Sequence, residues 1–138
     1  MENLKLKYVA PYLPYGLECH VMGLVEDDYA DNPVPILTKL VGLYTDTKKS
    51  EYAECSHAEY TDSVFIETDL FPILRPLSEY SKIIDIVDEM SDYHIKVIKD
   101  NPDMVKMLPY YIVEEMLENH IDIFGLIPKG LAIDKNTL

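Results

Sequence analysis

The first half of the chain has short apolar runs separated by Gly, Pro and charged residues, a pattern typical of strands and turns. Leu4, Leu6 and Tyr8 alternate with lysines, the period of a strand with one solvent-facing side. Prolines at 11 and 14 then predict a bend or an edge segment at residues 10 to 16, because proline cannot donate to a strand ladder. Residues 51 to 63 favour no single element. The other predicted elements are strands at 4–8, 16–25, 37–44 and 64–71, and a polar turn at 46–50.

After Pro76 the apolar spacing changes to that of helices. A helix is predicted over 79 to 92, because its apolar residues recur at i, i+3 and i+4 after Ser78, which suits an N-cap. Residues 95 to 98 fit either a short strand or another helix. Asn101-Pro102 is typical of a helix start, and Pro109 begins a further helix whose apolar stripe contains Ile112, Met116 and Leu117.

These elements predict an α+β fold: a small, mainly antiparallel sheet from the first half, packed against two or three C-terminal helices. With 138 residues and 48% apolar positions, the chain has the size and composition of a single domain, which we place at residues 1–138. Phe124, Leu126 and Ile133 make the carboxyl end too apolar for a free tail. We therefore expect it to fold back and dock against the sheet.

No apolar run approaches the roughly 20 residues that cross a bilayer, so we expect no membrane partner. The amino end lacks the apolar stretch of a secretory signal. Two cysteines do not make a disulfide scaffold. Together these features predict a cytoplasmic protein.

Acidic residues dominate the charge: 25 Asp and Glu against 12 Lys and Arg, a formal net charge of -13. Direct binding to a nucleic acid is disfavoured, because it depends on clustered cations. Residues 50–74 contain no Lys or Arg at all. A field of one sign either attracts a basic protein partner or only keeps the protein in solution. The candidate partner-binding carboxylates in and around this stretch are Glu51, Glu54, Glu59 and Asp62.

Eleven tyrosines form a second candidate surface. Tyr12 and Tyr15 lie beside prolines, and aromatic rings are enriched at protein interfaces. We include both as candidate partner-binding residues. Half-buried positions at the edge of the core are the competing explanation.

The candidate chemical groups do not form a recognisable catalytic or metal-binding pattern. Cys19-His20 and Cys55 with His57 lack the paired spacings of a zinc site. No phosphate-binding loop or hydrolase motif occurs. We therefore expect no catalytic residue, metal ligand or cofactor. His120 with Asp122 is the one pair beside an apolar stripe that could serve a small enzyme or a small-ligand site. The competing explanation is a structural contact at a helix end, where a cation complements the helix dipole.

Three segments carry a resemblance: APYLPYGL at 10–17, PILRPLS at 72–78 and HIDIFGLIPKGLAID at 120–134. Together they resemble an uncharacterised family of small proteins encoded by phages, prophages and gut metagenomes of Bacteroidetes. The resemblance touches the beginning, middle and end of the chain and implies a phage-associated protein in a host cell. It implies no activity, cofactor or catalytic residue.

These features predict a non-enzymatic acidic accessory protein that binds a host or phage protein. One alternative is an inhibitor that imitates nucleic acid and occupies a basic groove. The other is a small enzyme or ligand-binding module near His120 and Asp122. The sequence leaves the oligomeric state open.

Overall fold

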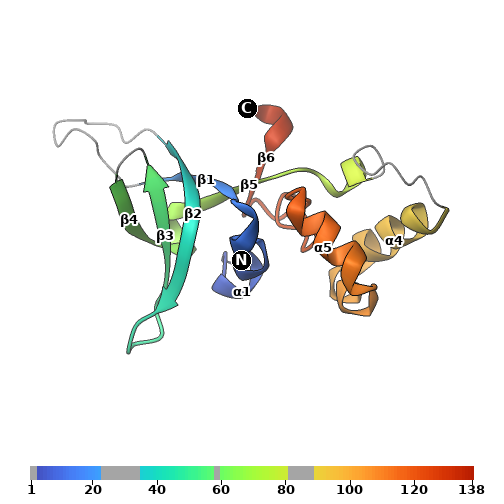
Figure 1. The fold of residues 1–138 in the computed structure, drawn as a ribbon, viewed down its shortest axis with the longest axis horizontal. Helices are drawn as coiled ribbons and strands as arrows, with labels where there is room; N and C mark the ends of the chain where they lie inside the picture. Colours follow the sequence, from blue (N-terminus) through green and yellow to red (C-terminus); the bar gives the residue numbers. More distant parts are fainter. Residues whose placement is uncertain (1–2, 23–34, 58–59, 81–88) are drawn as a thin grey trace. The chain divides into compact units, whose positions relative to one another are not determined.

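The computed structural model describes residues 3–22, 35–57, 60–80 and 89–138 (Figure 1). The chain forms two compact units, Met1–Ile73 and Leu74–Leu138, and each is described here by itself. The first contains most of the strands and the second most of the helices, so the α+β prediction is confirmed. The prediction of a single domain stays a prediction.

The amino end is helical, so the predicted strand at 4–8 is wrong. A single turn, α1 (Leu6–Val9), runs directly into the 3-10 helix η1 (Ala10–Tyr15). Pro11 occupies the start of η1, where its missing N–H costs nothing and its fixed φ suits a helix. Gly16 ends η1 with a φ of 64°, in the left-handed region that glycine adopts without strain. The short apolar alternation at 4–8 was therefore outweighed by the helix-compatible prolines that follow it.

Five strands of the first unit form an antiparallel sheet in the order β4-β3-β2-β1-β5. The predicted strand at 37–44 is confirmed, and the one predicted at 16–25 is confirmed over Glu18–Val21, while residues 23–25 lie outside the described part. The turn at 46–50 is also confirmed, since it joins β2 to β3. The strand bounds are β1 (Glu18–Val21), β2 (Ile36–Thr45), β3 (Glu51–His57), β4 (Tyr60–Phe65) and β5 (Leu70–Leu74).

The predicted continuous strand at 64–71 is wrong, because a helical turn, α2 (Ile66–Asp69), interrupts it. The reason lies in the topology. β4 pairs with β3, whereas β5 pairs with β1 on the other side of β2, so the chain must leave the β4 edge and cross to the far side of β1. A strand that ran straight through residues 64–71 could not make both pairings.

One face of this sheet, the covered face, carries buried side chains from several strands, among them Cys19, Leu40, Ala53 and Val64. The other, which we call the open face, is exposed where it crosses β2 and β4, at Leu37, Tyr44 and Phe65, whereas Ile73 of β5 on the same face is buried. Helix α1 contacts β3 and η1 contacts β2, and they contribute buried side chains such as Tyr12. A β-bulge between Leu40 and Gly42 shifts the alternation of β2, so Tyr44 lies on the open face although Leu40 lies on the covered one.

The second unit begins with the 3-10 helix η2 (Leu77–Glu79) and continues through α4 (Glu89–Asp100), η3 (Pro102–Met107) and α5 (Tyr110–Glu118). Most of the predicted helix at 79–92 lies outside the described residues. Residues 95–98, for which the sequence allowed a short strand or a helix, are helical and belong to α4. The predicted helix after Pro109 is confirmed, with the stripe Ile112, Met116 and Leu117 buried.

Asn101 caps η3 as its position predicts, because its side-chain oxygen accepts a hydrogen bond of 3.2 Å from the N–H of Asp103. The carboxyl end contains β6 (Ile133–Asp134) and η4 (Lys135–Thr137). Leu126 is 1% exposed, so this segment is not a free tail, whereas its docking against the sheet stays a prediction. No helix in the described ranges is long and apolar enough to cross a membrane.

Candidate functional site

Three aromatic side chains lie side by side across the open face of the sheet. Tyr44, Tyr52 and Phe65 are register partners on β2, β3 and β4, and we call them the aromatic row. The Tyr44 and Tyr52 rings stack with centroids 5.0 Å apart, and the Tyr52 and Phe65 centroids are 4.9 Å apart. Tyr44 is 39% exposed and Phe65 is 49% exposed. The row is thus an ordered aromatic surface in contact with solvent.

Asp46 holds the central ring of the row in place. Its Oδ1 accepts hydrogen bonds from the N–H groups of Lys48, at 3.0 Å, and Ser50, at 2.8 Å. Its Oδ2 accepts a bond of 3.1 Å from the Tyr52 hydroxyl. Partial desolvation, followed by the Asp46 carboxylate, raises the pKa of the Tyr52 phenol. Asp46 therefore fixes both the β2–β3 turn and the orientation of Tyr52.

The acidic residues singled out from the sequence do not share one face. Glu54 is on the open face with Tyr52, two residues along β3. Glu51 lies on the opposite side, where its Oε1 accepts a hydrogen bond of 3.0 Å from the N–H of Leu6. Asp62 is on the covered side of β4, opposite Cys55. Glu59 lies outside the described residues. Of the four, only Glu54 is shown beside the aromatic row.

The two tyrosines singled out beside prolines have different environments. Tyr12 is 1% exposed and belongs to the core of the first unit. Tyr15 is half-buried at the end of η1. Tyr12 therefore has no surface to offer a partner in this structure, and its ring stabilises the fold.

The two cysteines are buried thiols on the covered face. Burial, followed by the neighbouring Cys55 and then Glu18, raises the pKa of Cys19. Burial also raises the pKa of Cys55, with a smaller contribution from Asp62 and an opposing hydrogen bond from Thr38. Within the described residues, no group of three or more His, Cys, Asp or Glu side chains could hold a metal ion. Both thiols therefore act as small core side chains.

In the second unit, Asp122 is a buried carboxylate that organises a turn. It is 3% exposed, and its Oδ1 and Oδ2 accept hydrogen bonds from the N–H groups of Leu126, at 2.8 Å, and Ile127, at 2.9 Å. Burial raises the pKa of Asp122, and the backbone N–H bonds together with the charge of Lys129 oppose that shift. The backbone of Asp122 also donates to the carbonyl of Arg75 at 2.9 Å.

A pocket of about 310 Å³ lies next to this turn. Ile98 and Lys99 of α4 form one wall, and Leu77 and Ser78 of η2 form another. The lining is mainly apolar, and Asp122 contributes to it. His120 is half-buried and is not among the lining residues, with a φ of 56° and its carbonyl bonded to the Arg75 N–H at 2.8 Å. The structure therefore brings only Asp122 of the His120–Asp122 pair to the pocket.

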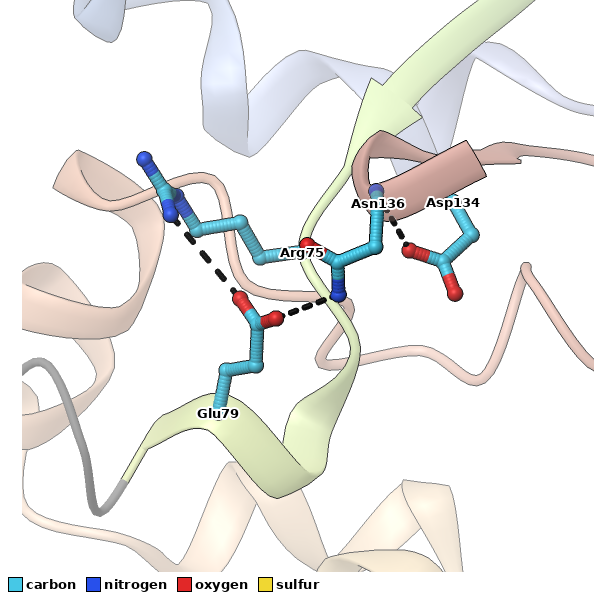
Figure 2. A network of polar contacts seen from close by, with 4 residues as sticks. All are labelled: Arg75, Glu79, Asp134 and Asn136. Carbon is cyan, nitrogen blue, oxygen red and sulfur yellow. Dashed lines mark hydrogen bonds and ion pairs between the residues drawn. The ribbon is translucent and has the colours of Figure 1, made fainter. Parts of the chain in front are cut away.

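Arg75 and the carboxyl end meet at Glu79 (Figure 2). Nη1 of Arg75 lies 3.8 Å from Glu79 Oε2, and the side-chain amide of Asn136 donates to Glu79 Oε1. Asp134 in turn accepts a bond of 2.9 Å from the N–H of Asn136. These partly exposed contacts join η4 to η2 within the second unit. We interpret them as structural contacts and not as a chemical site.

Sequence reasoning missed the aromatic row. A signal was available, because Tyr44 and Tyr52 flank the polar turn at 46–50 symmetrically, and such residues pair in a hairpin. Phe65 could not be added, since its register depends on where β4 starts. Comparison with known protein families, curated proteins and solved structures finds no match to this chain.

Proposed function

We propose that the protein is a non-enzymatic accessory protein that binds another protein through the open face of its sheet. The observation that carries the proposal is the aromatic row, whose neighbouring rings lie on three paired strands, with Tyr44 and Phe65 exposed. Aromatic side chains of this kind contribute large contact area at low entropic cost and are enriched in the centres of protein interfaces.

The charge around the row favours a basic partner. Glu54 lies on the same face, and the strands β3 and β4 carry no Lys or Arg. A net charge of -13 makes the long-range field attractive to a basic surface. We place the protein in the cytoplasm of a phage host, the setting that the resemblance implies.

The test is capture of partners from host lysate with the intact protein and with Tyr44→Ser and Phe65→Ser. Tyr93→Ser is the control, because Tyr93 is also an exposed aromatic residue but lies on α4 in the second unit. Partners that depend on both row residues, survive Tyr93→Ser and are lost at high salt support the proposal. Partners that ignore the row variants contradict it.

A second candidate function is binding of a small ligand in the second unit. The pocket of about 310 Å³ favours it, since that is the lower end of the size that small-molecule sites have. An NMR screen with small, mainly apolar compounds tests this function. Binding that shifts the amides of Leu77, Ile98 and Ile127, and is lost in Ile127→Trp, would establish it. Compounds that shift none of these amides would refute it.

The structure gives less support to the alternative in which the protein imitates nucleic acid. Mimicry requires carboxylates in rows on one surface, whereas Glu51 and Glu54 lie on opposite sides of β3. The described part of the acidic stretch therefore supports a binding surface that combines aromatic rings with charge.

A further inference from the structure

We propose that the partner adds an extended segment to the sheet as a strand alongside β4, with a basic residue opposite Asp62. This inference rests on the proposed function and specifies how the partner docks. Three observations support it: β4 lies at the edge of the sheet, Asp62 lies on that strand, and the aromatic row ends there at Phe65.

β4 is an edge strand. It stands first in the strand order, and among the described residues it pairs only with β3. An edge strand offers unpaired N–H and C=O groups on every second residue, which a further strand can satisfy. Its sequence, YTDSVF, contains none of the Pro or Lys residues that usually block such pairing. Tyr60 is 70% exposed at one end of the strand and Phe65 is 49% exposed at the other.

Asp62 decides which strands can be added. Its side chain is half-buried on the covered side of β4, and among the described residues no cation lies within ion-pair distance of it. An added strand covers Asp62 further and so raises the cost of keeping its charge unpaired. A Lys or Arg directly opposite removes that cost, because oppositely charged cross-strand pairs stabilise a sheet.

The same residue disfavours pairing between two copies of this chain. Two β4 strands paired antiparallel about Asp62 place the two carboxylates opposite each other, and like charges in that position are destabilising. Pairing about Ser63 instead places Asp62 opposite Val64 of the second copy, where it is covered without a partner. We therefore assign the edge to a different protein with a basic segment.

The aromatic row adds a second requirement. The row runs Tyr44, Tyr52, Phe65 across three strands and ends at the edge. An apolar or aromatic residue opposite Phe65 on the added strand would extend it. Phe65 and Asp62 are three positions apart and face opposite sides of the sheet. In either strand direction, the partner segment therefore carries its apolar and basic residues three positions apart.

The experiment selects binders from a library of randomised nine-residue peptides displayed against the intact protein. Enriched peptides are expected to have an aromatic or aliphatic residue and a Lys or Arg at positions i and i+3. Each is then synthesised in two forms, with N-methyl groups on one or the other alternating set of amides. Only one set faces β4, so one form is expected to lose at least tenfold in affinity and the other to bind within about threefold.

Charge is tested in parallel. Asp62→Asn is expected to weaken the basic peptides at least threefold with little change in the melting temperature. Glu118→Gln is the matched control, because Glu118 is exposed on α5 in the second unit, and binding should stay within twofold. Chemical-shift changes should centre on residues 60–65.

The outcomes separate this inference from the proposed function. Peptides that need Tyr44 but tolerate both N-methylated forms and Asp62→Asn overturn strand addition and leave the sheet face as the binding surface. A concentration-dependent dimer that Ser63→Pro dissociates assigns the edge to a second copy and overturns the inference. A selection that enriches no peptide, with no row-dependent protein captured, overturns both.

Discussion

Asp122 and Leu126 are joined by a hydrogen bond of 2.8 Å from the Leu126 N–H to Oδ1 of Asp122, and both residues are buried. The second carboxylate oxygen accepts from Ile127 at 2.9 Å. One side chain thereby satisfies two consecutive backbone donors at a turn that water reaches poorly. A buried donor left without an acceptor costs about 1–3 kcal/mol.

Asp122→Ala should therefore lower the free energy of unfolding by about 2–4 kcal/mol, because it leaves two donors unsatisfied. Asp122→Asn retains one acceptor oxygen and should cost roughly half as much. Urea unfolding followed by circular dichroism measures both. Equal losses for the two variants would show that the backbone bonds are not the source of the effect.

The pH dependence of Asp122 has a definite sign. Its native pKa is raised, so the native state binds more protons than the unfolded state between the unfolded pKa of about 3.9 and the native value. The contribution of Asp122 to stability is therefore greatest below this window, falls as pH rises through it, and is constant above the native pKa. The stability of the parent protein relative to Asp122→Asn should decline with rising pH across that window. Denaturation of both proteins in steps from pH 3.5 to 7 measures it, and a rising difference would contradict the sign.

Cys19 and Cys55 should be unreactive in the native protein. Both thiols are buried and their pKa values are raised, so little thiolate is available to a disulfide reagent at neutral pH. Absorbance after addition of an aromatic disulfide should show two thiols per chain only in denaturant. Rapid native labelling of either cysteine would contradict the burial. A chelator should leave the melting temperature unchanged, and one tightly held zinc per chain would contradict that expectation.

Asp46→Ala should loosen the β2–β3 turn and release Tyr52. The variant loses three hydrogen bonds to a partly exposed carboxylate, so the free energy of unfolding should fall by about 1–3 kcal/mol. The Tyr52 pKa should move down toward its ordinary value, because one cause of its upward shift is removed. NMR titration of the tyrosine ring signals measures this pKa. Asp69→Ala, on α2, is the control and should leave the Tyr52 signal unchanged.

Truncation at the carboxyl end should have two distinct outcomes. Removal of residues 135–138 breaks the exposed Asn136–Glu79 contact and should cost no more than about 1 kcal/mol. Removal of residues 124–138 also takes away Leu126, which is fully buried, and should unfold the second unit. Hydrogen exchange resolved along the chain distinguishes the two. A longer truncation that keeps its protection at α5 would show that the segment is dispensable.

Elements with strong local signals were predictable from the sequence. The turn at 46–50 and the helix after Pro109 follow from turn residues and helical spacing. The amino end was not predictable in this way, since three alternating apolar residues fit a strand and a short helix almost equally well. The break at Ile66–Asp69 depends on the pairing of β5 with β1, a long-range relationship without a local signal.

The candidate site was less predictable than the fold. Composition identified the acidic stretch but not that Glu51 and Asp62 lie away from Glu54, because that distribution depends on strand register. Tyr12 and Tyr15 stood out by their neighbouring prolines, whereas exposure is decided by the packing of η1. The pocket beside Asp122 combines residues from three separated segments, which sequence spacing does not bring together.

Because of the bulge in β2, the aromatic row can survive the loss of one residue from that strand. Substitutions along β2 change one side chain at a time, whereas a one-residue deletion in a regular strand turns every later side chain to the opposite face. Deletion of Val41 would instead remove the extra residue, so that Leu40 stays on the covered face while Tyr44 stays on the open face opposite Tyr52. A one-residue gap at position 41 in a related sequence would therefore mark a strand without the bulge in which the row is kept.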